Sequence, residues 1–145
     1  NRGRSLLGNV LSMEGIEVPA LCDINKDNLG LAIDMVEQAG KPKPEGYFKD
    51  EEVFREMLKR EDLDAVLIAT PWHWHTPMAV AAMRAGKYAG VEVPAAMSYQ
   101  ECWDLVKTHE ETGVPCMMLE NWSFRRDNLA VLRMIREGLF GEIVH

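Results

Sequence analysis

The sequence has 145 residues, and 47% of them are hydrophobic, which is enough for one packed domain. Its 16 basic and 23 acidic side chains give a net charge of −7, and the basic ones are scattered along the chain. Nucleic acids and anionic membranes attract clustered Lys and Arg, so this composition argues against both as main partners. No apolar run approaches the ~18 residues that a membrane-spanning helix needs.

Three cysteines, Cys22, Cys102 and Cys116, are odd in number and too widely spaced for a disulfide framework. Free thiols in apolar surroundings are typical of a reducing compartment, which favours the cytoplasm. An export signal could precede residue 1, so the sequence does not fix the location.

In the first half of the chain, apolar residues alternate between the spacing of helices and that of strands. The pattern predicts a helix with its apolar face at 6–11, a strand at 18–22, a helix with its face at 29–36, a strand at 47–48, and a helix with its face at 53–58. Gly15 and Gly40 are placed to end the first two helices, and Asp50 is a suitable N-cap for the third.

The second half repeats this alternation. It predicts strands at 64–69, 88–91 and 115–119, with helices ending at 85–86, beginning after Ser98, and running from about 127 to 137. Ser98 and Glu101 form the pattern of a capping box. The helix that follows has Cys102, Leu105, Val106 and His109 on one face, and the last helix is expected to turn Leu129, Leu132 and Ile135 inward.

Strands that alternate with helices of this length predict an α/β fold with a doubly wound parallel sheet. In the strand order 3-2-1-4-5-6 of such sheets, the first strand is central. Because this chain opens directly into a helix, we expect residues 1–141 to be a dinucleotide-binding domain without its first strand, and residues 142–145 to begin a further domain. Two inner sheet edges would then be unpaired, so residues 1–145 expressed alone are expected to be poorly soluble or molten.

Gly3 and Asp23 are spaced as in a dinucleotide-binding unit. Gly3 precedes a helix, and Asp23 ends a strand twenty residues later. An acid at this place accepts hydrogen bonds from the adenosine ribose. No Arg lies close to Asp23 in the sequence, so a 2′-phosphate would find no cation, which favours NAD over NADP. The alternative is that Asp23 caps the next helix.

Residues 72–75, with the sequence Trp-His-Trp-His, follow one buried strand, and Glu92 follows the next. Ligands of open parallel sheets bind outside the carboxyl ends of the strands, so both segments are expected to converge on one ligand site. Alternatively, the tryptophans could cover the end of the sheet, and His75 could bond the backbone at a helix start. A metal held by His73 and His75 would need a third protein ligand, and no metal site is predicted.

These segments resemble the Gfo/Idh/MocA oxidoreductases in Thr70-Pro71 before a helix, His75, Gly86-Lys87 and the acid-x-Pro at 92–94. The chain is more similar to the NAD-dependent glycosidases of glycoside hydrolase family 109, through residues 72–80, 92–96 and 118–121. The resemblance implies a Rossmann-like NAD-binding domain, joined in the whole protein to a C-terminal α+β domain through which homo-oligomers could form. It implies these cofactor-binding residues: Asn1 and Arg2 beside the pyrophosphate, Asp23 at the ribose, Trp72, His73, Trp74, His75, Glu92 and Val93 along the cofactor, and Asn121 near the nicotinamide.

Val93 departs from the wider family, which commonly has a lysine there that assists hydride transfer. The glycosidases are similar to this chain in having valine. The resemblance therefore implies an α-N-acetylgalactosaminidase that acts on a small-molecule glycoside by transient C3 oxidation, elimination, water addition and re-reduction. No catalytic residue is assigned to residues 1–145, because the acid/base groups are expected in the other domain. The alternatives are an NAD-dependent sugar dehydrogenase and a non-catalytic NAD-binding module.

Overall fold

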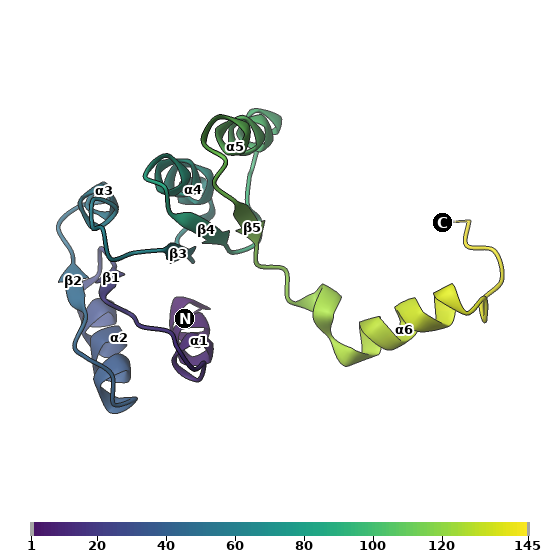
Figure 1. Ribbon diagram of the computed structural model, residues 1–145, viewed down its shortest axis with the longest axis horizontal. Coiled ribbons are helices and arrows are strands. Elements are labelled where there is room, and N and C mark those ends of the chain that lie inside the picture. The colour runs from purple at the N-terminus through teal and green to yellow at the C-terminus, as the bar shows by residue number, and fades with distance from the viewer. Residues whose placement is uncertain (1, 145) are drawn as a thin grey trace.

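A computed structural model describes residues 2–144, in which helices and strands alternate along the chain (Figure 1). The strands are β1 (Ala20–Cys22), β2 (Glu45–Tyr47), β3 (Ala65–Ile68), β4 (Tyr88–Val91) and β5 (Cys116–Met118). The α-helices are α1 (Arg2–Leu11), α2 (Lys26–Gln38), α3 (Phe54–Met57), α4 (His75–Arg84), α5 (Tyr99–Thr112) and α6 (Arg126–Arg136). Two short 3₁₀ helices, η1 (Trp72–Trp74) and η2 (Trp122–Phe124), precede α4 and α6.

All strand pairs are parallel, as the alternating pattern predicts. β1 pairs with β2, placing Ala20 opposite Glu45, and β4 lies between β3 and β5 in a second sheet. Within residues 2–144, no ladder joins β1 to β3, so the inner edges of the two sheets are not paired with each other. The doubly wound α/β prediction is confirmed.

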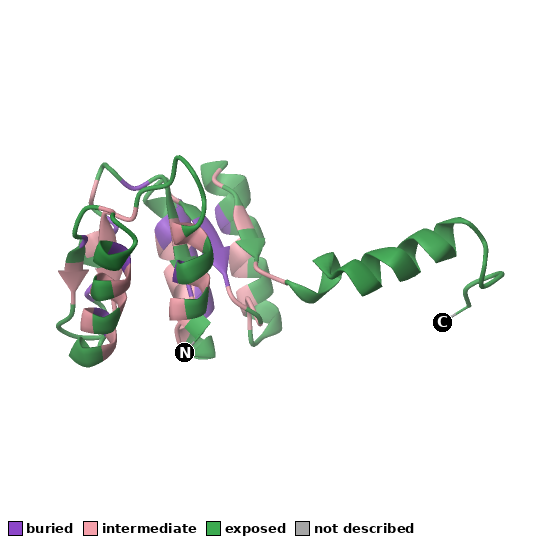
Figure 2. Ribbon diagram, turned by 90° about the horizontal axis from the view of Figure 1, so that it is seen from below, coloured by how far each residue is buried: buried purple, intermediate pink, exposed green. Residues whose placement is uncertain are grey.

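The main core lies between α4 and the three-stranded sheet. Ala79, Ala82 and Met83 of α4 are fully buried against a cluster that includes Ala89 and Val91 of β4. Small side chains on α4 let the helix approach the sheet closely, and Figure 2 shows the buried residues concentrated there. This packing holds the ends of β3 and β4 in a fixed relation to the start of α4.

Local signals in the sequence account for the ends of α5. The side chain of Ser98 accepts the Glu101 N–H at 3.2 Å, and the Glu101 carboxylate accepts the Ser98 N–H at 3.0 Å. At the other end Gly113 has a φ of 70°, and its N–H bonds the His109 carbonyl. Since a left-handed residue strongly favours glycine, both the predicted capping box and the helix end are confirmed.

The predicted helix after Asp50 is much shorter than expected. Asp50 accepts the Glu52 N–H at 2.9 Å within a turn, and α3 begins only at Phe54 after Val53. Asp50 therefore stabilises the turn before the helix, and the assignment of Asp50 as its N-cap is wrong. The side chain competes for a local backbone donor two residues on, as aspartate commonly does in turns.

The face predicted for α5 is packed only in part, and the inward face predicted for α6 is wrong. On α5, Thr108 is 2% exposed and Leu105 packs on the core, whereas Cys102, Val106 and His109 are exposed. Thr108 can be buried because its hydroxyl donates to the Asp104 carbonyl at 2.7 Å.

Helix α6 projects away from the sheets and is exposed along its length (Figures 1 and 2). Leu129, Leu132 and Ile135 form the predicted apolar stripe, but they are 46%, 41% and 37% exposed. A helical period shows which residues share a face, but it does not show which other element covers that face.

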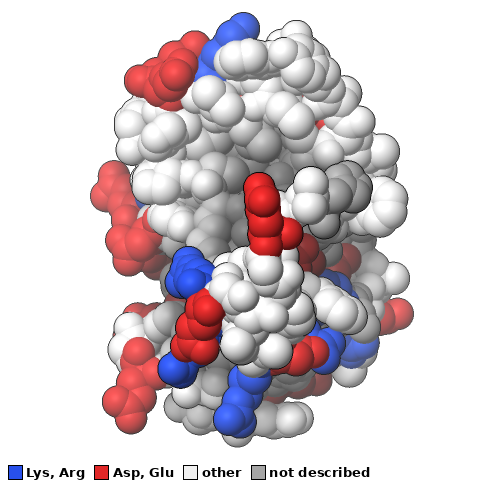
Figure 3. All heavy atoms as spheres, turned by 90° about the vertical axis from the view of Figure 1, so that its right-hand side faces the viewer, with Lys and Arg blue, Asp and Glu red and all other residues white. Residues whose placement is uncertain are grey.

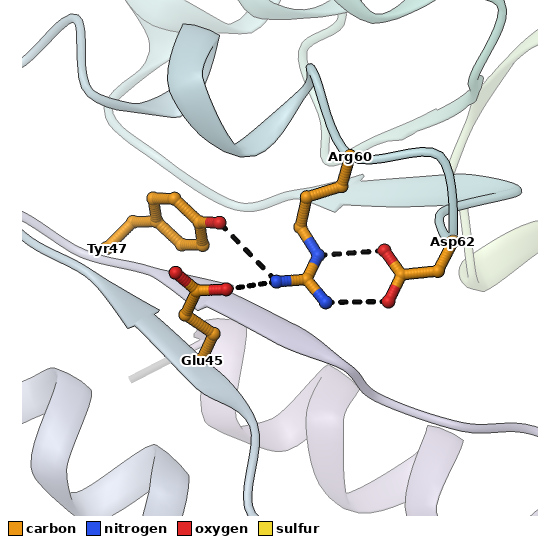
Figure 4. A network of polar contacts seen from close by, with 4 residues as sticks. All are labelled: Glu45, Tyr47, Arg60 and Asp62. Atoms are coloured by element: carbon orange, nitrogen blue, oxygen red, sulfur yellow. Dashed lines mark hydrogen bonds and ion pairs between the residues drawn. The ribbon is translucent and has the colours of Figure 1, made fainter.

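A polar cluster ties β2 to the segment before β3 (Figure 4). Arg60 donates to both carboxylate oxygens of Asp62, at 2.8 and 2.6 Å, and also pairs with Glu45 and Tyr47. The hydrogen bonds from Arg60 lower the pKa of Asp62. Bidentate geometry makes this pair more specific than an ordinary surface ion pair.

Among the described residues, no helix is long and apolar enough to span a bilayer.

Candidate functional site

The carboxyl ends of the parallel strands bring most of the predicted site residues to one edge of the molecule. Asp23 directly follows β1, η1 follows β3 after a short turn, Glu92 and Val93 follow β4, and Asn121 lies shortly after β5. Ligands of doubly wound folds bind outside this edge. Asn1, which is also assigned to the site, lies outside the described residues.

Asp23 is half-buried and forms a tight turn at the end of β1. Its Oδ1 accepts the Asn25 N–H at 2.8 Å, and Asn25 itself caps α2 by accepting the N–H groups of Asp27 and Asn28 at 2.9 and 3.0 Å. The helix cap is therefore Asn25, which removes the alternative role considered for Asp23. Its second carboxylate oxygen, Oδ2, takes no part in this turn, and the ribose-binding role of Asp23 stays a prediction. The nearest basic side chain along the chain, Lys26, has its ammonium over the Phe48 ring, 5.2 Å from the centroid.

Arg2 and Glu92, which are ninety residues apart, meet at the site. Arg2 Nε donates to Glu92 Oε1 at 2.7 Å, with the Glu92 side chain 12% exposed and that of Arg2 44% exposed. The ion pair joins the first turn of α1 to the end of β4. Of the predicted residues, these two are brought into direct contact, across the gap between the N-terminal helix and the three-stranded sheet.

The Trp-His-Trp-His segment does not present all four side chains to the same side. Trp72 is 59% exposed and His73 is also exposed. Trp74 turns inward and meets Phe54 edge-to-face, with ring centroids 5.9 Å apart, and His75 is 1% exposed. The expectation that both tryptophans and both histidines converge on a ligand is therefore corrected. The cofactor role of the exposed Trp72 and His73 stays a prediction, whereas Trp74 is half-buried and His75 is buried.

His75 and Thr76 bond the turn that follows β4. Nδ1 of His75 lies 2.7 Å from the Pro94 carbonyl oxygen and Nε2 lies 2.8 Å from that of Thr70, while Thr76 Oγ1 donates to the Ala95 carbonyl at 2.9 Å. The alternative that His75 bonds the backbone at a helix start is thus what the structure contains. Thr76 was not predicted, and its place one residue after His75 at the start of a buried helix is the signal that could have indicated it.

Val93 and Asn121 remain at the open edge. The Val93 side chain is 40% exposed, and the Val93–Pro94 peptide bond is cis. Asn121 is exposed, and its neighbour Glu120 fixes the following turn by accepting the Trp122 N–H at 2.6 Å. Glu120 was not assigned a role from the sequence. The side chains of Val93 and Asn121 are therefore both accessible at this edge.

A surface cavity lies at the opposite edge. About 770 Å³ in volume, it lies between α3 and α4 and is lined in part by Lys59, Arg60, Arg84 and Lys87, which stand before β3 and β4. On the face in Figure 3 that includes α6, basic and acidic side chains are interspersed over the lower part, and the upper part is mostly uncharged. Residues 2–144 contain no group of three or more His, Cys, Asp or Glu side chains that could hold a metal ion.

The environment of Asp23 also affects Cys22. Burial, with a smaller contribution from the Asp23 charge, raises the pKa of Cys22 to about 11 from 9.0. Because the thiolate is the reactive form, Cys22 is expected to alkylate at pH 8 about a hundredfold more slowly than an ordinary exposed thiol. Labelling with iodoacetamide and peptide mass spectrometry would measure this, with the urea-unfolded protein as the control. Equal rates for Cys22 in the folded and unfolded protein would contradict the burial argument.

The comparisons with known proteins agree with this geometry. Residues 3–120 match the Gfo/Idh/MocA family, which is described as an oxidoreductase family with an NAD-binding Rossmann fold. The chain belongs to this family. Its Gfo/Idh/MocA domain binds NAD.

Curated relatives that match this chain are named as glycosyl hydrolase family 109 proteins. A Glycosyl hydrolase family 109 protein of Stenotrophomonas maltophilia is 49% identical over 146 residues, covering 99% of this chain and 32% of that protein. One from Shewanella woodyi is 46% identical over 144 residues, covering 99% of this chain and 31% of that protein. The chain therefore spans about a third of the length of these relatives.

Solved structures confirm the fold. The scyllo-inositol dehydrogenase of Lactobacillus casei, determined with NAD(H) and scyllo-inositol, superposes with a TM-score of 0.84 at 19% identity, over 99% of this chain and 40% of that one. An NAD binding oxidoreductase from Klebsiella pneumoniae superposes with a TM-score of 0.69 at 26% identity, over 97% of this chain and 35% of that one. The Rossmann-like prediction is thus confirmed by architecture as well as by sequence.

Proposed function

We propose that this Gfo/Idh/MocA domain serves a glycosidase, with an α-N-acetylgalactoside as the first substrate to test. The observation that carries the proposal is Val93, which is 40% exposed at the end of β4 and borders the cofactor edge. Valine can neither exchange a proton nor donate a hydrogen bond, so this position differs from the lysine that assists hydride transfer in the wider family. The names of the curated relatives support the same choice.

The residues of this chain hold and orient the cofactor in this proposal. Asp23 accepts hydrogen bonds from the ribose, Arg2 lies beside the pyrophosphate and orients Glu92, and Trp72 and His73 border the cofactor from the end of β3. Asn121 reaches the nicotinamide side from the end of β5. When bound, NAD supplies a hydride acceptor that can return the hydride, which allows transient oxidation of the sugar at C3, elimination of the aglycone across C2 and C1, water addition and re-reduction without net redox change.

A redox-neutral assay separates this proposal from a sugar dehydrogenase. The full-length protein is expected to release phenol from phenyl α-N-acetylgalactosaminide without accumulating NADH. Because the C2 proton leaves and returns, deuterium at C2 should appear in water during turnover. NADH formed in step with product, without free phenol, would instead establish a dehydrogenase. A protein that binds NAD but catalyses neither reaction would favour a non-catalytic module.

The Val93→Ala variant is the matched control. Alanine also lacks any exchangeable proton, so the variant is expected to keep a phenol-releasing, NADH-neutral reaction even where the rate changes. A variant that began to accumulate NADH would show that Val93 shapes the outcome by packing instead of by chemistry. Activity on another glycoside with the same deuterium exchange would correct the substrate and leave the reaction type standing.

A further inference from the structure

Trp122 is an exposed indole close to the carboxyl end of β5. It begins η2 directly after Asn121, and it is 61% exposed. A single apolar side chain at the surface needs no explanation by itself. Trp122 differs from such a residue because other side chains fix both its backbone and one face of its ring.

The backbone of Trp122 is held on both sides. The Glu120 carboxylate accepts its N–H at 2.6 Å, and the side-chain amide of Asn128 donates to its carbonyl at 2.6 Å. Glu120 lies between β5 and η2, whereas Asn128 lies in the first turn of α6. These two bonds restrict the backbone of one residue from opposite ends, so the direction of the indole is set before any ligand binds.

The ring of Trp122 is supported on one face. The guanidinium carbon of Arg125 lies over it, 4.6 Å from the ring centroid. Arg125 is itself fixed by Asp127, whose two carboxylate oxygens accept its N–H groups at 3.1 and 3.0 Å. A residue with one ring face covered can be 61% exposed only if much of the other face is open. That open face is a preformed, flat and apolar surface.

The stereochemistry of the proposed substrate decides which part of it can lie on such a surface. In the chair form of an α-galactoside, the aglycone at C1 and the hydrogen at C3 are both axial on the same face. The hydroxyl at C4 is axial on the opposite face, so neither face of the sugar ring is flat. The C3 hydrogen has to face the nicotinamide in order to leave as hydride. The aglycone therefore also projects toward the nicotinamide side of the sugar.

We propose that the open face of Trp122 binds the aglycone, as a platform for a flat apolar leaving group such as an aryl ring. This inference rests on the glycosidase function proposed above, in which Asn121 reaches the nicotinamide side. Trp122 is the next residue along the chain, so the platform lies on the side to which the aglycone projects. A tryptophan offers a large contact area at a low cost in conformational entropy.

The platform predicts a preference between two glycosides that differ only in the leaving group. The full-length protein is saturated with NADH, which already carries the hydride, so sugar oxidation cannot begin and calorimetry measures binding alone. The wild type is expected to bind phenyl α-N-acetylgalactosaminide about tenfold more tightly than the methyl glycoside, because only the phenyl ring can stack on the indole. Trp122→Ala should lose this preference, and Trp122→Phe should keep most of it.

Trp103→Ala is the matched control. Trp103 is 45% exposed on α5, where its ring meets Tyr99 with the centroids 6.1 Å apart, and its loss should leave the preference unchanged. The inference is overturned if the wild type shows no preference for the phenyl glycoside, or if Trp122→Ala keeps it. A kept preference together with a lower urea midpoint in Trp122→Ala would assign the indole to packing against another part of the protein.

The phenol-release assay tests the glycosidase separately from the platform. A phenyl preference that depends on Trp122, in a protein that releases no phenol, would leave an aryl-binding platform and remove the glycosidase. Release of phenol with a preference that is insensitive to Trp122 would remove the platform and leave the glycosidase.

Discussion

Replacing Asp23 by alanine is expected to weaken NAD binding by about tenfold to a hundredfold. Asp23 directly follows β1, and one of its carboxylate oxygens accepts the Asn25 N–H. Loss of hydrogen bonds between a charged acceptor and the ribose hydroxyls should cost about 1.5–3 kcal/mol of binding free energy. Titration of the full-length protein with NAD, followed by calorimetry or fluorescence, measures the change directly.

Two further variants separate binding from folding at this position. Asp23→Asn keeps an oxygen that can accept the Asn25 N–H, so the turn should persist while ribose binding weakens. Asp34→Ala, on the exposed side of α2, removes an acid without touching the strand end and should bind NAD normally. The selectivity for NAD over NADP should fall in both Asp23 variants, since the carboxylate repels a 2′-phosphate. Wild-type NAD affinity in Asp23→Ala would remove Asp23 from the site.

Replacing Met83 by alanine is expected to lower the free energy of unfolding by about 2–5 kcal/mol. Met83 is 0% exposed and lies among Ala79, Ala89 and Val91, which are also fully buried. Truncation would leave a cavity in this buried cluster, which the surrounding side chains can fill only in part. The shift of the urea midpoint in circular dichroism gives the size of the loss.

Met97→Ala is the control for this loss. Met97 is 58% exposed, and a truncation there should change stability by no more than about 0.5 kcal/mol. Both substitutions remove the same atoms, so the difference between them isolates burial. Similar midpoints for the two variants would show that α4 is not the centre of the core.

Much of the fold was predictable because it depends on local periodicity. Strands β3, β4 and β5 lie within or at the runs that the apolar pattern predicts, and the alternation with helices was enough to predict parallel pairing. Cap residues fixed the start of α5 by bonds that reach no further than three residues. Asp50 shows the limit of such signals, because the same residue type stabilises a turn as readily as a helix start.

The sequence predicted where along the chain the candidate site residues stand. The rule that ligands bind beyond the carboxyl ends of parallel strands grouped the ends of β1, β3, β4 and β5, and the spacing of Gly3 and Asp23 indicated a dinucleotide. It could not show that Arg2 reaches Glu92, because an ion pair over ninety residues depends on how α1 lies against the sheet. The sequence alone also did not show that Asn25, and not Asp23, caps α2.

The sequence by itself determined which elements form, how they alternate and which residues stand at the strand ends, because these follow from side-chain period and nearby backbone bonds. Tertiary structure alone decided which side chains turn inward. It buried His75 between two carbonyls, turned Trp74 onto Phe54, and left the apolar stripe of α6 exposed. Burial is a property of two surfaces in contact, and a periodic pattern describes only one of them.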